Sequence, residues 1–139
     1  MRPADRFPLV QCGISYPIQQ IEGVSMAEFN FAVPILPGKT EAWRKAIEEM
    51  KGPRREDYKR SRKNLGIKRE QVCLQMTPHG DMVVVHIEAK DPANVMPGMF
   101  AAATPFDVWF LETVLRGVHG IDPKGPPPPA PEVVLDFKG

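Results

Sequence analysis

Two alternating runs separated by a tight turn constrain the fold of this chain more than any other feature. The first run covers about 70–76 and the second 82–89, and apolar residues occupy every second position in most of their length. A period of two is typical of a β-strand that buries one face. The connection at 77–81, TPHGD, contains a proline that presets φ and a glycine that permits a positive φ. The sequence therefore predicts a β-hairpin.

A third alternating run and two helical stretches precede this hairpin. The run covers residues 28–35, and its apolar side chains share one face: Phe29, Phe31, Val33 and Ile35. A helix is predicted from Thr40, a good N-cap residue. Its apolar residues recur at helical spacing and form one stripe: Trp43, Ala46, Ile47 and Met50. A second helical stretch covers about 54–65.

The C-terminal third combines helix signals with a proline-rich stretch. Asp91-Pro92 and Thr104-Pro105 each place a proline where a helix begins, and Pro97-Gly98 predicts a break between them. The second of these helices carries an apolar stripe: Phe106, Trp109, Phe110, Thr113 and Val114. Residues 125–131 are rich in proline and are expected to be extended, and 132–137 are expected to form a closing strand.

The predicted order is strand, helix, strand, strand, helix, strand. This is the ferredoxin-like βαββαβ arrangement, an α+β fold whose antiparallel sheet carries helices on one face. The 139 residues suit one domain, which we assign to 26–139. Residues 1–25 resemble an irregular N-terminal leader, and Met26 is the alternative natural start.

The sheet face that the helices leave uncovered is the expected site. By alternation it carries six predicted ligand-binding residues: Asn30, Gln75, Met82, Val84, His86 and Glu88. Two such faces packed in a twofold homodimer would form a dimeric α/β-barrel with a partly polar interior, suited to a small hydrophobic or aromatic molecule. His86, as an acid–base group, and Asn30, as its hydrogen-bond partner, are candidate catalytic residues. The alternative is that His86 is a structural, hydrogen-bonded strand residue.

Two polar features lie outside that face. His119 and Asp122 form a candidate second polar site; the alternative is a helix C-terminus in which His119 faces the negative end of the dipole. Residues 51–69 hold nine basic and two acidic residues, a net charge of +7 in a chain whose total is +1. Such a stretch binds an anionic partner or is a solvated helix face. A nucleic-acid partner is not expected, because the aromatic residues of the strands are assigned to the core.

The remaining composition excludes several classes. Cys12 and Cys73 are far apart, and neither they nor the three histidines have metal-ligand spacing, so no metal or other cofactor is expected. Two unpaired thiols fit a cytoplasmic protein. No apolar run approaches the ~20 residues that span a bilayer, so no membrane partner is expected.

Three segments carry a resemblance to a known family: 65–81 with its TPHGD turn, PFDVWF at 105–110 and HGID at 119–122. Together they resemble a bacterial domain family of unknown function that is similar to the dimeric α/β-barrel superfamily, over about residues 26–137. That superfamily also contains antibiotic biosynthesis monooxygenases. The resemblance brings no activity with it, so whether the chain is an enzyme stays open. We expect small-molecule binding in the barrel first. The alternatives are a cofactor-independent monooxygenase-like activity, which the resemblance implies, and an interaction module built on the basic helix.

Overall fold

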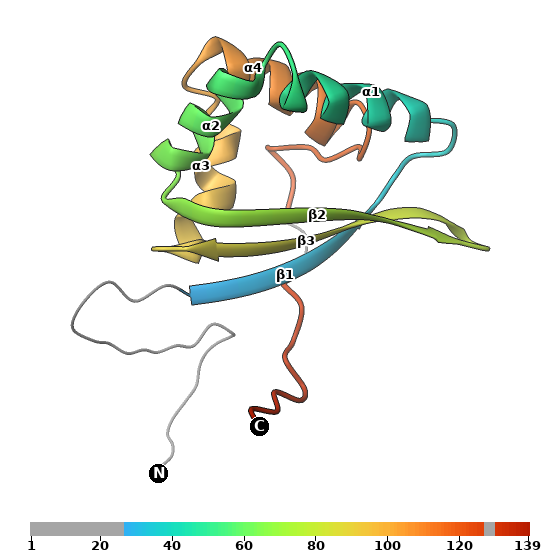
Figure 1. Ribbon diagram of the computed structural model, residues 1–139. Coiled ribbons are helices and arrows are strands. Elements are labelled where there is room, and N and C mark those ends of the chain that lie inside the picture. The colour runs from blue at the N-terminus through green and yellow to red at the C-terminus, as the bar shows by residue number, and fades with distance from the viewer. Residues whose placement is uncertain (1–26, 127–129) are drawn as a thin grey trace.

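A computed structural model describes residues 27–126 and 130–139 of the chain. Its antiparallel sheet has three strands, β1 (Ala27–Pro34), β2 (Ile67–Thr77) and β3 (Gly80–Ala89), in the order β1-β3-β2. The helices all lie on one face of this sheet (Figure 1). The α+β class, the antiparallel sheet and the hairpin are therefore confirmed.

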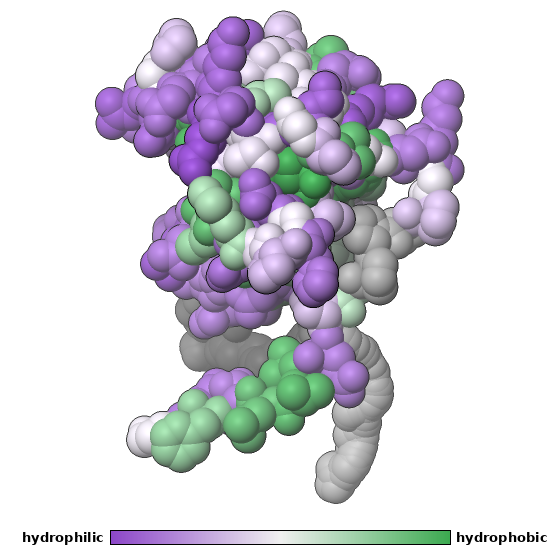
Figure 2. Space-filling view, turned by 90° about the vertical axis from the view of Figure 1, so that its right-hand side faces the viewer, coloured by the Kyte–Doolittle hydropathy of each residue, from purple (hydrophilic) through white to green (hydrophobic). Residues whose placement is uncertain are grey.

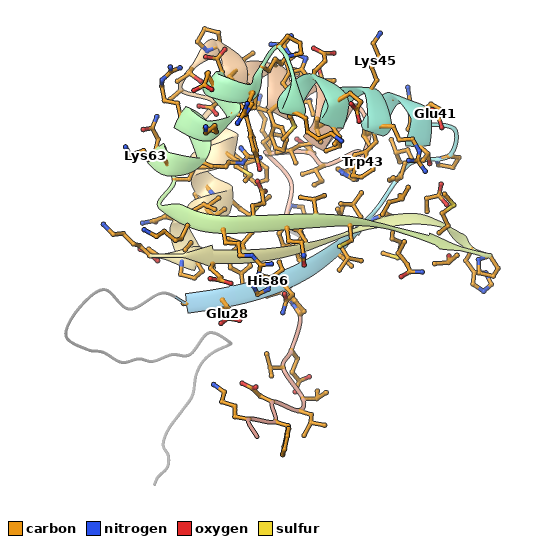
Figure 3. The ribbon with its side chains drawn as sticks, viewed as in Figure 1. Glu28, Glu41, Trp43, Lys45, Lys63 and His86 are labelled. Atoms are coloured by element: carbon orange, nitrogen blue, oxygen red, sulfur yellow. The ribbon has the colours of Figure 1, made fainter. Side chains whose placement is uncertain are left out.

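The helical layer contains more elements than the sequence pattern predicted. It consists of α1 (Thr40–Lys51), α2 (Arg55–Asn64), the short 3-10 turn η1 (Pro92–Asn94), α3 (Val95–Ala101), α4 (Pro105–Phe110) and the π-helical η2 (Leu111–Arg116). Figure 3 shows Trp43 directed from α1 toward the sheet, while Glu41 and Lys45 point away from it. The predicted amphipathic stripe of α1 is thus directed at the sheet.

The hydrophobic core lies between the sheet and the helices. On the sheet side it contains the predicted face of β3, namely Val83, Val85 and Ile87, and the matching residues of β1. On the helix side it contains Trp43, Val95, Met99, Leu111 and Leu115. Strand β3 is the central strand, so its apolar face is covered most completely and Ile87 is 0% exposed.

The predicted break at Pro97-Gly98 is wrong, because both residues lie inside α3. Pro97 is the third residue of this helix, and a missing backbone N–H costs little in the first turn. Gly98 allows close packing: a Cβ at this position would clash with Cδ2 of Leu65. The glycine therefore marks a helix contact and not a helix end.

The roles predicted for two threonines also differ from the structure. Thr40 does not cap α1; instead its hydroxyl donates a hydrogen bond to Oδ2 of Asp81 at 2.6 Å and ties the helix to the hairpin turn. Thr113 was predicted within the apolar stripe but is exposed, whereas Leu111, Val114 and Leu115 are buried. The π-helical turn shifts the phase of the buried face relative to an α-helix, which the 3.6-residue period did not anticipate.

The predicted closing strand at 132–137 is wrong, because residues 130–139 contain no strand or helix. A strand exists only where a neighbour accepts its ladder hydrogen bonds, and this segment leaves the sheet on the side opposite the helices (Figure 1). Its apolar side chains are exposed, Leu135 by 84%, and Figure 2 shows them as a projecting green arm. The predicted leader at 1–25, Met26, and residues 127–129 of the proline-rich segment lie outside the described residues.

Gly66 is expected to be required at the junction of α2 and β2. Its φ is +75°, and its N–H donates to the carbonyl of Lys63, so the residue ends the helix in the left-handed region. Gly66→Ala is expected to lower the free energy of unfolding by about 1–2 kcal/mol. Gly66→Asn, which tolerates this region better, is expected to cost clearly less in the same urea titration. Equal losses for both variants would contradict this explanation.

Candidate functional site

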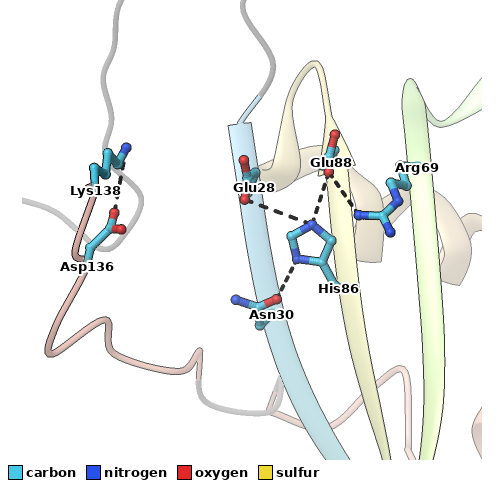
Figure 4. Close-up of polar contacts among 7 residues, drawn as sticks. All are labelled: Glu28, Asn30, Arg69, His86, Glu88, Asp136 and Lys138. Carbon is cyan, nitrogen blue, oxygen red and sulfur yellow. Dashed lines mark hydrogen bonds and ion pairs between the residues drawn. The ribbon is translucent and has the colours of Figure 1, made fainter.

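A polar cluster occupies one end of the uncovered sheet face (Figure 4). Nδ1 of His86 lies 2.7 Å from Oδ1 of Asn30, its register partner on β1, and Nε2 of His86 lies 3.2 Å from Oε2 of Glu88. Arg69 lies 3.4 Å from the same carboxylate, and Glu28 lies 3.9 Å from His86. The structure therefore brings three of the six predicted ligand-binding residues into one hydrogen-bonded chain.

The contacts of His86 define two chemical states. If Oδ1 of Asn30 accepts and Glu88 accepts, both ring nitrogens donate and the ring is an imidazolium. If the Asn30 amide is turned so that Nδ2 donates, the ring is neutral and donates only to Glu88. The hydrogen bond with His86 is the main cause that lowers the pKa of the Glu88 carboxyl. The cluster thus holds the His86 ring between the Asn30 amide and the Glu88 carboxylate.

The other predicted residues of this face extend away from the cluster. Val84 pairs in register with Ala32 and Cys73, and this row is apolar and solvent-facing. Met82 pairs with Gln75 farther along the strands, and the amide of Gln75 donates to the backbone carbonyl of Met76. Asn30, Gln75 and Val84 are exposed on this face, and ligand binding by these residues stays a prediction.

A cavity lies on the opposite side of the sheet, between the strands and the helices. Its volume is about 190 Å³. Most of its wall is apolar, including Phe29, Phe31, Trp43, Val85, Met99 and Phe110. Three polar side chains complete the wall: Arg62, Glu70 and His119. Among the six residues predicted from the sequence to bind a ligand, none contributes to this wall.

Arg62 and Glu70 form a buried ion pair at the cavity. Nε of Arg62 donates to Oε1 of Glu70 at 2.9 Å, and the two side chains are only 7% and 8% exposed. The hydroxyl of Tyr58 donates to the same oxygen at 2.7 Å. Burial, followed by the Glu70 carboxylate, raises the pKa of Tyr58, so this hydroxyl remains a donor. The sequence reasoning missed this site because it treated residues 51–69 as one basic surface.

His119 and Asp122, the candidate second polar site, are not joined by a hydrogen bond within the described part of the chain. Nδ1 of His119 bonds to the backbone carbonyl of Pro34 at 2.9 Å, and its ring lines the cavity. Asp122 is exposed and accepts a hydrogen bond from the backbone N–H of Lys124. His119 therefore ties the end of the helical layer to β1.

Protonation of His119 is expected to weaken the fold in mildly acidic solution. Burial lowers the pKa of His119 below its unfolded value of about 6.5. Between the two values the unfolded chain binds the additional proton, so stability is complete above pH 6.5 and falls as the pH decreases toward the folded pKa. Thermal unfolding between pH 7.5 and 5 measures this, with His79→Gln in the exposed turn as control. His119→Gln is expected to reduce the dependence of the melting temperature on pH. An unchanged pH dependence would contradict the role assigned to His119.

Much of the positive charge in the basic stretch is paired. The residues with carboxylate partners are Lys51, Arg54, Lys59, Arg60, Arg62 and Arg69. Arg54 also lies over the ring of Trp109, 4.1 Å from its centroid, and therefore contributes to packing. An anionic partner for the remaining charge stays a prediction.

Asp107 gives the PFDVWF segment at 105–110 its structural role. In PFDVWF, its carboxylate accepts from the hydroxyls of Thr104 at 2.9 Å and Ser61 at 2.7 Å, and its N–H donates to Thr104. The motif therefore joins α4 to α2, and the helix start predicted at Thr104-Pro105 is confirmed, with Thr104 as its cap.

No group of three or more His, Cys, Asp and Glu side chains within 27–126 and 130–139 is arranged to hold a metal ion. Nor does any helix of these residues combine the length and apolar character needed to cross a bilayer. Comparison of the chain with family models, curated proteins and solved structures finds no match.

Proposed function

We propose that this protein binds a small, largely apolar molecule in the cavity between the sheet and the helices. The observation that supports the proposal is a cavity of about 190 Å³ with aromatic and aliphatic walls and a few polar side chains. Small-molecule sites have this composition. An apolar cavity of about 150 Å³ holds a benzene molecule. The cavity described above is therefore suited to a benzene ring with a short substituent.

Two neighbouring valines of β3 provide the matched test. Val85 lines the cavity, whereas Val84 lies on the opposite face of the same strand. With ethylbenzene as probe, isothermal titration is expected to show binding to the wild type and to Val84→Phe but not to Val85→Phe, whose larger ring fills the cavity. The reverse pattern would move the site to the uncovered face. Absence of binding to the wild type would contradict the proposal.

Because Val85→Phe also risks overpacking the core, a second cavity-filling variant is needed. Ile47 lines the cavity from α1 and is only partly buried, so Ile47→Phe is easier to accommodate. Circular dichroism identifies which variants remain folded. A folded Ile47→Phe that binds ethylbenzene as tightly as the wild type would also count against the cavity.

The uncovered face supports a second candidate, a cytoplasmic homodimer of the ferredoxin-like, dimeric α/β-barrel type. Two exposed apolar features favour it: the row Ala32–Val84–Cys73, and the C-terminal arm that carries Leu135 and Phe137. Pairing of two copies would bury both and place the His86 cluster in an enclosed interior. Sedimentation velocity is expected to give a dimer for the wild type and a monomer for Val84→Asp. A wild-type monomer at all concentrations would overturn this candidate.

In such a dimer His86 would be the acid–base group of a cofactor-independent oxygenase-like reaction. The hydrogen-bonded chain Asn30–His86–Glu88 favours this alternative because it orients the ring and offers a path for its proton. Loss of an aromatic oxidation in His86→Gln, with the dimer intact, is the expected result if the cluster is catalytic. Retained turnover in that variant would assign His86 a structural role.

A further inference from the structure

A second pocket, open to solvent, lies where α2 is followed by β2, and we name it the α2–β2 pocket. Its volume is about 210 Å³. Charged side chains from both elements make up most of its wall: Lys59, Arg62 and Lys63 of α2, and Lys68, Arg69 and Glu70 of β2. Five cations and one carboxylate give this wall a formal charge of +4. The basic residues of the 51–69 stretch therefore gather, in part, around one hollow.

The local structure of both elements brings lysines to this pocket. Lys59 and Lys63 are four residues apart, so they lie on the same face of α2. On β2 the register with β3 shifts between Ile67 and Arg69, which leaves Lys68 as the extra residue of a β-bulge. Bulges redirect a side chain and are frequent beside functional sites. The bulge thus accounts for the position of Lys68 in the same wall as the lysines of α2.

Three of the five cations already have a carboxylate partner. The pairs are Arg62–Glu70 at 2.9 Å, Arg69–Glu88 at 3.4 Å and Lys59–Glu56 at 4.0 Å. Within residues 27–126 and 130–139, no carboxylate lies within 4.0 Å of Lys63 or Lys68. Two like charges on one wall repel each other, and an anion bound between them replaces this repulsion with attraction.

We propose that the α2–β2 pocket binds the phosphate monoester group of a small molecule, with Lys63 and Lys68 as the groups that neutralise it. Two unpaired ammonium groups match a dianion. A phosphate monoester carries nearly two negative charges at pH 7.5 and three acceptor oxygens, whereas a carboxylate carries one charge and two oxygens. Lysine is a common phosphate ligand, which it binds as a point charge.

Phenyl phosphate and benzenesulfonate test this assignment on the wild-type protein at pH 7.5, because Tyr58 and Ile67 offer apolar surface for a ring. Both probes present three oxygens, but benzenesulfonate carries only one negative charge. In about 0.15 M NaCl, attraction between distant exposed charges is largely screened. Titration followed by amide NMR is expected to show about tenfold tighter binding of phenyl phosphate, with the largest shift changes within 58–70. Equal affinities would overturn the dianion assignment. Shift changes centred elsewhere, or none at about 10 mM probe, would overturn the site.

Lys63→Gln and Lys68→Gln each remove one charge from the pocket and are expected to weaken binding of phenyl phosphate about fivefold or more. Lys45→Gln is the matched control, because it changes the net charge equally. Figure 3 shows Lys45 on α1, pointing away from the sheet and far along the helical layer from Lys63. All three lysines are exposed, so the variants are expected to fold. An equal loss of affinity in all three would assign the binding to net charge and overturn the pocket.

This site is separate from the cavity of the proposed function. The Arg62–Glu70 pair contributes to both walls, but Lys63 and Lys68 line the α2–β2 pocket and not the cavity. Ethylbenzene binding to Lys63→Gln and Lys68→Gln is therefore expected to equal that of the wild type. Weaker ethylbenzene binding in these folded variants would show that the two sites are one and overturn the separate assignment. Either proposal can otherwise fail without the other.

Discussion

Glu70→Gln is expected to lower the free energy of unfolding by about 3–5 kcal/mol, because it leaves the Arg62 guanidinium as a buried charge without a counterion. The substitution keeps the size of the side chain and one acceptor oxygen. The decrease in the free energy of unfolding is therefore caused by the unpaired charge more than by a change in volume. Both side chains are more than nine-tenths buried, and water therefore screens the charge poorly. Urea denaturation at pH 7.5 measures the change.

The double-mutant cycle distinguishes a charge effect from a packing effect. Arg62→Met with Glu70→Gln is expected to recover most of the stability lost in Glu70→Gln, because replacement of a complete buried pair is often close to neutral. The exposed pair Arg60–Asp57 is the control, and Asp57→Asn is expected to cost less than about 1 kcal/mol. A double variant as unstable as Glu70→Gln would show that packing and not charge causes the loss.

Ile87→Ala is expected to lower the free energy of unfolding by about 2–5 kcal/mol, because it removes buried methyl and methylene groups from the centre of the core. Ile87 is fully buried on the central strand, where neither β1 nor β2 can move inward without disturbing the other ladder. The measurement is again urea denaturation, with the slope checked for two-state behaviour.

Val84→Ala is the matched control on the same strand. Val84 is 39% exposed on the opposite face, so its truncation is expected to cost less than about 1 kcal/mol. If Val84→Ala were as destabilising as Ile87→Ala, the uncovered face would be buried in solution. That result would agree with the proposed homodimer, and sedimentation of the variant would decide whether a dimer was lost.

The faces of the strands were predictable because a period of two fixes which side chains share a side of the sheet. Phe29, Phe31, Val83 and Val85 lie on the helix side as expected, and Asn30, His86 and Glu88 meet on the other side. The alternation is also read from neighbouring residues alone, without knowing which distant segments are in contact. The predicted polar cluster therefore exists, although its function is untested.

The cavity and its ion pair were not predictable in the same way. A cavity results from imperfect packing between layers, and the sequence pattern of one layer does not predict the space between two layers. Arg62 looked like part of a solvated basic face. One signal was present: Glu70 falls on the side of β2 that carries Val72 and Leu74, and a carboxylate on an apolar face needs a buried partner.

Within residues 27–126 and 130–139, no strand pairs with the outer edge of β1, and the apolar arm at 132–137 is exposed; together they offer one way for copies of this chain to associate. An unpaired strand edge accepts another strand, and a β-prone segment supplies one. If two chains exchange their arms, both edges are satisfied and assembly stops at a pair. If the exchange is not reciprocal, each chain that is added leaves one strand edge and one arm of the assembly without a partner. Association would then continue with rising concentration, and the product would be a filament of unlimited length instead of a defined oligomer.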